Sequence, residues 1–248
     1  MTNIHFFYGC SMTAGDELSD GTPEYPFKFG ETPDYWKARA IILDSYLKFD
    51  EYFTANKKLA YPAILHKKYN IDTVNMAENG MSLRHIITKV TALVSNAEDT
   101  ICHIFLQVPP MGREHYLTSQ YETSFQLVNE VRGNEALVNY SKAKLMSHGD
   151  VDESVADITD LVLLNGFLKS KNITFTIISI NKSLDIRFRY LFPTQQQWLL
   201  KFKKELPILD VNVPEDWCFP SCHMNHHGHY QFADFIKTNV IDKLCSRI

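Results

Sequence analysis

The sequence predicts a three-layer α/β/α fold built on a mostly parallel sheet of about five strands. Short apolar runs rich in β-branched residues recur along the 248-residue chain, and segments with helical spacing lie between them. This alternation is typical of βαβ units. The runs "HIFLQV" and "FTIISI" are nearly continuous in hydrophobic character, as expected of strands covered on both faces. No Gly/Ser- or Pro-rich linker divides the chain, so we expect one domain over residues 1–248.

The expected strands and helices follow one another along the chain. The strands are expected at residues 3–9, 71–77, 100–108, 173–180 and 206–213. Helical spacing of apolar residues covers 54–70, 82–99, 153–172 and 226–244. Pro62 should kink the first of these helices or begin a new one, and Ser82 can cap the start of the second. We expect a flavodoxin-like strand order, in which ligands bind outside the carboxyl ends of the strands.

Two long segments do not fit this minimal pattern. Residues 17–53 are rich in aromatic side chains, and residues 111–150 form an excursion after the third expected strand. Insertions at the functional edge of a sheet often form lids or substrate walls. Extra packing or an oligomer contact is an equally good reading of both.

Composition excludes several classes of protein. The formal net charge is −4 and no strongly basic block is present, which argues against a nucleic-acid partner. The chain has five cysteines, an odd number scattered along the sequence, which suits a reducing compartment better than a disulfide framework. No signal peptide is recognisable, and no apolar run reaches the ~20 residues of a membrane helix. We therefore expect a cytoplasmic protein without a membrane partner, and the oligomeric state stays open.

Four short blocks, each containing glycine and polar residues, hold the candidate functional residues. They are "YGCSMTAGDEL" around Ser11, "NMAENGMSLRHI" over 75–86, "IFLQVPPMGRE" over 104–114, and "CHMNHHGHYQFADFI" over 222–236. A serine hydroxyl is a poor nucleophile until an adjacent imidazole removes its proton. Ser11 therefore needs a histidine that is close in space.

Together the four blocks resemble the SGNH (GDSL-like) hydrolases, and most closely the divergent SGNH-like proteins of phage genomes. The first block matches the form G-C-S-x-T-x-G at Gly9, Cys10, Ser11, Thr13 and Gly15. The second matches N-x-A-x-x-G-x-S at Asn75, Ala77, Gly80 and Ser82. The last matches H-P-N-x-x-G-H at His223, Asn225, Gly228 and His229, with Met224 in place of proline.

The resemblance implies the SGNH hydrolase fold and a serine hydrolase site that needs neither cofactor nor metal. Ser11 is the expected nucleophile and His223 the base that removes its proton. The backbone N–H groups of Ser11 and Gly80 are the expected oxyanion donors. Cys10, next to the serine, is a second potential nucleophile, although we expect its side chain to face the core. His229 is expected to be structural.

The sequence departs from the family pattern at two positions. Pro109 stands where the family has an asparagine that donates to the oxyanion, and Gln107 or Arg113 can substitute or bind substrate. Pro220 stands three residues before His223, where the orienting acid belongs. Asp216 is the candidate for that acid, and without it the site is a Ser-His dyad. The Cys and His residues of 218–229 have no second ligand pair elsewhere, which argues against a zinc site.

The predicted function is hydrolysis of a small acylated molecule or carbohydrate ester, for example O-deacetylation. Two alternatives stay open. The fold can serve as a binding module for a sugar or a nucleotide-like ligand, which the missing asparagine and aspartate motivate. Acyl transfer to an acceptor other than water uses the same residues, and the sequence does not separate it from hydrolysis.

Overall fold

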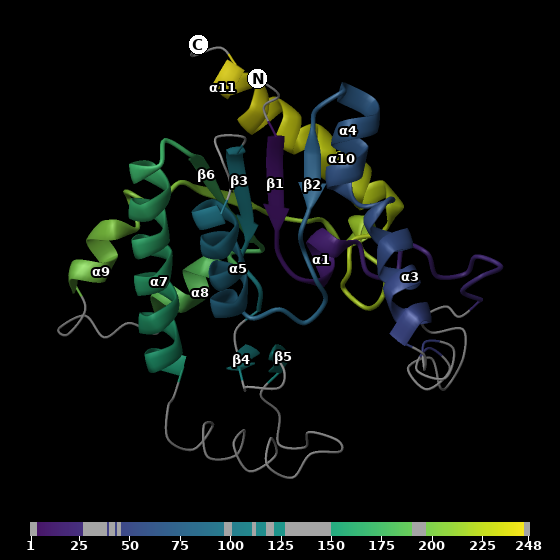
Figure 1. Ribbon diagram of the computed structural model, residues 1–248, viewed down its shortest axis with the longest axis horizontal. Coiled ribbons are helices and arrows are strands. Elements are labelled where there is room, and N and C mark those ends of the chain that lie inside the picture. Colours follow the sequence, from purple (N-terminus) through teal and green to yellow (C-terminus); the bar gives the residue numbers. More distant parts are fainter. Residues whose placement is uncertain are drawn as a thin grey trace, which may run out of the picture. The chain divides into compact units, whose positions relative to one another are not determined.

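The computed structural model confirms the α/β fold class and the parallel sheet of five strands (Figure 1). It describes residues 4–26, 39, 43, 46–96, 101–110, 113–117, 122–126, 150–189 and 197–245. The strands of the sheet are β1 (Ile4–Tyr8), β2 (Thr73–Asn75), β3 (Ile101–Gln107), β6 (Thr174–Ile180) and β7 (Ile208–Val211). Their order is β2-β1-β3-β6-β7, which is the flavodoxin-like order when the five strands are counted along the chain.

The chain divides into two compact units, each assembled from separate segments. The first comprises Met1–Phe7, Ser11–Asn79 and Val213–Ile248, and the second comprises Tyr8–Cys10 and Gly80–Asn212. The expectation of one domain with two insertions stays a prediction. Within 17–53 the structure describes residues 17–26, 39, 43 and 46–53, and within 111–150 it describes 113–117, 122–126 and 150. The rest of both segments lies outside the described residues.

The first unit places helices beside the paired strands β1 and β2. Its helices are α1 (Ser11–Ala14), α3 (Tyr46–Lys57), α4 (Tyr61–Tyr69), the short 3-10 helix η1 (Glu215–Trp217), α10 (His226–Ile236), the π-helical turn η2 (Lys237–Ile241) and α11 (Asp242–Cys245). The α4 helix packs against both β2 and α10. The Tyr61 ring makes edge-to-face contacts with Phe7 and Phe232, with centroid distances of 5.5 and 4.8 Å. This aromatic cluster joins α4 and α10 to β1.

The second unit is built on the parallel strands β3, β6 and β7. Its helices are α5 (Leu83–Asn96), α7 (Asp150–Ser170), α8 (Ser183–Arg189) and α9 (Gln197–Phe202). The α7 helix packs against α5, α8 and β6. An antiparallel hairpin, β4 (Arg113–Leu117) and β5 (Glu122–Gln126), was not expected from the sequence.

Both expected helix starts are confirmed. The backbone N–H of His85 donates to Ser82 Oγ at 3.2 Å, so Ser82 caps α5. Pro62 begins a new helix instead of kinking one, because it lies in the first turn of α4, where its missing N–H costs nothing. None of the helices in the described part of the chain combines the length and the apolar character that crossing a membrane requires.

Candidate functional site

Ser11 begins the four-residue helix α1, which follows β1 directly (Figure 1). Its backbone carbonyl accepts hydrogen bonds from the N–H groups of Gly15 and Asp16, both at 2.9 Å. Gly15 has a φ of +80°, and a Cβ there would lie 2.8 Å from the Cβ of Ala60. Glycine therefore closes the turn that holds Ser11, whose residue surface is only 3% exposed.

His223 reaches Ser11 from a tight loop near the C-terminus. The ring Nε2 lies 3.0 Å from Ser11 Oγ, which is a hydrogen-bond distance. Inside the loop, Phe219 donates its N–H to the His223 carbonyl at 2.7 Å, and Cys222 donates to the Phe219 carbonyl at 2.9 Å. The two side chains that the sequence analysis paired are thus brought together.

The start of α10 anchors this loop. Asn225 is the N-cap, and its Oδ1 accepts from the N–H of Gly228 at 2.8 Å. The Asn225 N–H donates to the Trp217 carbonyl at 2.8 Å, and its Nδ2 donates to the Asp216 carbonyl at 2.9 Å. His223, two residues before this cap, is consequently held by main-chain bonds on both sides.

The carboxylate beside the His223 ring belongs to Glu17 and not to Asp216. Glu17 Oε1 lies 3.4 Å from His223 Nδ1, and Nδ1 makes no hydrogen bond of ordinary geometry. The pair is therefore an electrostatic contact, longer than a formed hydrogen bond. Asp216 lies in η1 and is exposed, and among the described residues the ion pair of the His223 ring is the one with Glu17. The orienting role expected of Asp216 stays a prediction.

Glu17 is buried, with 2% of its residue surface exposed, and polar groups surround its carboxylate. Ser221 Oγ donates to Oε2, and Arg39 Nη1 lies 3.9 Å from Oε1. Burial raises the pKa of the Glu17 carboxyl, but the contacts with His223 and Ser221 and the charge of Arg39 outweigh burial and hold this pKa below its ordinary value. Glu17 is therefore ionised at neutral pH.

A second buried carboxylate, that of Asp16, lies next to Glu17 in the chain. Its Oδ1 pairs with the Arg39 guanidinium, and its Oδ2 accepts from Asn79 Nδ2 at 2.9 Å. The Tyr52 hydroxyl lies 3.5 Å from Asp16 Oδ1 and accepts a 3.2 Å hydrogen bond from the Glu17 N–H. Asp16 and Tyr52 therefore fix the Glu17 backbone, and Arg39 pairs with the Asp16 carboxylate.

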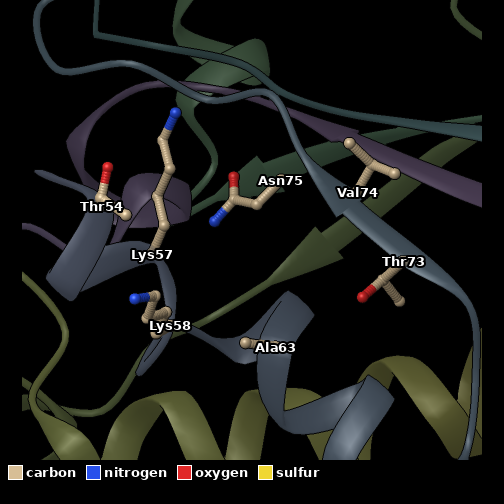
Figure 2. A pocket seen from close by; sticks show the side chains of 7 residues that line it. All are labelled: Thr54, Lys57, Lys58, Ala63, Thr73, Val74 and Asn75. Carbon is tan, nitrogen blue, oxygen red and sulfur yellow. The ribbon is translucent and has the colours of Figure 1, made fainter.

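The second block supports α1 from β2. Asn75 Nδ2 donates to the Thr13 carbonyl at 2.9 Å. Figure 2 shows that the Asn75 side chain also lines a pocket of about 340 Å³. Its lining residues come from α3, β2 and the chain between them, and are Thr54, Lys57, Lys58, Ala63, Thr73, Val74 and Asn75. Since Ser11, Glu17 and His223 do not line this pocket, we do not assign the substrate to it.

His229 is structural, as expected. It is fully buried and stacks on Tyr61 at a centroid distance of 5.9 Å. Its Nδ1 accepts the Tyr61 N–H at 3.0 Å, which requires the neutral ring with the hydrogen on Nε2. Burial, with a smaller contribution from the charges of His226 and His223, lowers the pKa of His229 to about 3.

The second unit contains the other residues singled out from the sequence. Gly80 has a φ of +79°, the left-handed conformation expected of a turn glycine, and its oxyanion role stays a prediction. Gln107 is 2% exposed and its Nε2 lies 3.4 Å from Cys10 Sγ, so the structure gives no support to its substrate role. Cys10 is buried against it, as expected. Arg113 is the first residue of β4, and its substrate role stays a prediction.

Sequence reasoning missed Glu17, Arg39 and Ser221. The available signal was the pair of acidic residues in "AGDEL", five and six residues after Ser11, which the sequence analysis assigned to a turn. In the part of the chain that the structure describes, no group of three or more His, Cys, Asp or Glu side chains is placed to hold a metal ion.

Known structures share this fold. The chain is similar to esterase EstA from Pseudoalteromonas sp., at 10% identity over 98% of this chain and 99% of that one, with a TM-score of 0.52. It is similar to a family two carbohydrate esterase from Corynascus thermopiles, at 10% identity over 98% and 67% of the two chains, with a TM-score of 0.51. A Desulfitobacterium hafniense DCB-2 protein described as lipolytic and of the G-D-S-L family matches at 10% identity over 96% and 99%, with a TM-score of 0.50.

At these identities the likeness shows the fold alone. No protein-family profile and no curated protein matches the chain. The resemblance to phage proteins in particular gains no support from the three structures above and stays an expectation.

Proposed function

We propose that this protein is a serine esterase of the SGNH type, with Ser11 as nucleophile and His223 as general base. The observation that carries the proposal is the 3.0 Å contact between Ser11 Oγ and His223 Nε2, made by residues 212 positions apart. A buried serine hydroxyl on the imidazole of a distant loop is the arrangement that acyl-transfer chemistry requires. Structures of esterases with the same fold are consistent with it.

The reaction has two halves. Ser11 Oγ attacks the ester carbonyl carbon while His223 Nε2 takes the hydroxyl proton. The tetrahedral intermediate then expels the alcohol, which receives that proton, and an acyl-serine remains. Water attacks the acyl-serine with His223 again taking a proton, and the acid leaves as Ser11 is restored. Every step needs only this pair, donors for the oxyanion and water.

The oxyanion donors in this proposal are the N–H groups of Ser11 and Gly80. Pro109 has no N–H, and its carbonyl is already bonded to Arg187 Nη2 at 3.0 Å. Loss of one oxyanion donor typically costs about 10²–10³ in rate. We therefore expect a slow esterase for a small substrate. A sugar acetate is the first substrate class to test, because one of the structures with this fold is a carbohydrate esterase.

The test uses a fluorophosphonate probe and short-chain p-nitrophenyl esters. Wild type should be labelled and should turn over the esters, and both signals should disappear in Ser11→Ala and His223→Ala. Cys10→Ala and the exposed Ser170→Ala are matched controls that should retain labelling. Labelling of Ser11→Ala at the wild-type rate would refute the proposal.

A binding module is the second candidate, and the missing donor at Pro109 favours it. In that case wild type shows neither labelling nor turnover, yet binds a sugar or nucleotide-like ligand in calorimetry. Acyl transfer is distinguished from hydrolysis by adding an alcohol acceptor to the reaction. If the protein is an acyltransferase, the amount of acylated alcohol rises and the amount of free acid falls.

A further inference from the structure

The two nitrogens of the His223 ring face different partners. Nε2 lies 3.0 Å from Ser11 Oγ, and Nδ1 lies 3.4 Å from Glu17 Oε1. For Nε2 to accept the serine proton, the ring hydrogen must be on Nδ1. A carboxylate that faces Nδ1 favours that tautomer and stabilises the imidazolium that forms during the reaction. Glu17 is the carboxylate in this place.

The loop itself has no acid that can do this. Pro220 occupies the position three residues before His223, and Asp216 is exposed without an ion pair to the ring. The residue after Pro220, Ser221, donates its hydroxyl to Glu17 Oε2. The loop therefore binds an acid that comes from another part of the chain, 204 residues away from Ser221.

The backbone of Glu17 has an unusual conformation that hydrogen bonds hold in place. Its φ of 71° is in the left-handed region that a glutamate seldom adopts. The Tyr52 hydroxyl and Asp16 Oδ1 accept its N–H at 3.2 and 3.1 Å. Arg39 pairs with Asp16, and its Nη1 also lies 3.9 Å from Glu17 Oε1, so it offsets part of the charge of this carboxylate. Glu17 Oε1 is also the oxygen that faces His223 Nδ1, at 3.4 Å.

Resting on the function proposed above, we propose that Glu17 is the positioning residue of His223, in place of the acid expected within the histidine loop. The nucleophile and the acid then both come from residues 11–17, and the histidine alone comes from the C-terminal loop. This arrangement supplies an orienting acid although Pro220 stands three residues before His223.

Other ionisable groups surround the pair and stay unchanged in the test. They are Asp16, Asp20, Arg39 and Tyr52 beside Glu17, and Cys222, His226 and His229 near His223. A difference between wild type and a variant at position 17 therefore reports the Glu17 charge.

The first measurement is an NMR titration of the His223 ring in the full 248-residue chain, assigned with His223→Ala. In Glu17→Gln the midpoint should fall below that of wild type, because the anion that favours the charged ring is gone. The control Asp216→Asn, a carboxylate-to-amide change in the same loop, should leave it in place. An unchanged midpoint in Glu17→Gln, or a shift in Asp216→Asn alone, would overturn the inference.

The second measurement is the pH profile of fluorophosphonate labelling. Glu17→Gln should lose about 10²–10⁴ in plateau rate, with its acid limb at lower pH. If Glu17→Gln does not fold, Ser221→Ala is the test, because it keeps the Glu17 carboxylate and removes one hydrogen-bond donor to it. We expect the labelling rate of Ser221→Ala to fall about tenfold. A wild-type labelling rate in this variant would refute the inference. If wild type is not labelled at all, the proposed function fails while the titration still tests Glu17.

Discussion

Replacing Gly228 by alanine is expected to destabilise the segment that carries His223. A Cβ at this position would lie 2.2 Å from the Trp217 carbonyl oxygen and 2.9 Å from the Trp217 Cβ. Real Cβ atoms essentially never lie closer than 3.0 Å to such a neighbour, so the two segments must separate by about 0.8 Å, from 2.2 to 3.0 Å. The carbonyl cannot move cheaply, because it also accepts the Asn225 N–H at 2.8 Å.

The magnitude follows from two opposing contributions. Overpacking against fixed backbone costs about 1–3 kcal/mol or more, and alanine recovers about 1 kcal/mol or less of helix propensity in the first turn of α10. We expect a net loss of about 2 kcal/mol, which for a chain of this size lowers Tm by roughly 4–8 °C. Thermal unfolding followed by circular dichroism measures it.

The matched control is Gly166→Ala in α7, where an added Cβ meets nothing within 4 Å. There the helix propensity acts alone, and Tm should rise by about 2–4 °C. If Gly228→Ala melts at or above the wild-type temperature, the steric reasoning about the Trp217 carbonyl is wrong.

Two further substitutions test buried polar groups. Burial lowers the pKa of His229 to about 3 from an ordinary value of 6.5, so below pH 6.5 the unfolded chain takes up a proton that the folded chain does not. The free energy of unfolding should therefore fall as the pH drops from 6.5 towards 3, by about 2 kcal/mol at pH 5. Urea unfolding at pH 7 and pH 5 measures this loss, and His229→Asn should remove the share of it that His229 causes. An unchanged difference between the two urea midpoints in His229→Asn would contradict the prediction. Arg187 is buried and pairs with Asp157 at 2.5 Å. Arg187→Ala should therefore lower the free energy of unfolding by about 3–5 kcal/mol, measured with urea. The control Arg189→Ala, at an exposed position, should change it very little, and equal losses in the two variants would refute a special role for the buried pair.

The strands were predictable because their signal is local. A strand covered on both faces is apolar at most positions, and the run 173–180 becomes β6 (Thr174–Ile180) with one residue of difference. The C-terminal helix was expected over 226–244, and the structure interrupts it with the π-helical turn at Lys237–Ile241. Apolar spacing over so few residues does not distinguish a π turn from an α turn, so the sequence held no sign of the interruption.

The site was predictable only in part. Ser11 and His223 were paired from ordered motifs, and the structure brings their side chains to 3.0 Å. The orienting acid was sought within the loop, at Asp216, because sequence reasoning looks for the acid near the histidine. The structure instead has Glu17 beside the ring, since a left-handed backbone at Glu17 and the Ser221 hydroxyl together set where its carboxylate points.

The sequence by itself determined the strands and most of the helices, because hydrophobic periodicity and turn chemistry act over a few residues. The pairing of Ser11 with His223 came from the order of the motifs that resemble those of the SGNH hydrolases. Only the tertiary structure decided which carboxylate faces Nδ1 of His223 and that Gln107 is buried against Cys10. These outcomes depend on backbone direction and on packing between segments far apart in the chain. No local pattern of residue types encodes such a contact, because the same side chain can face solvent or a partner depending on how the segments pack.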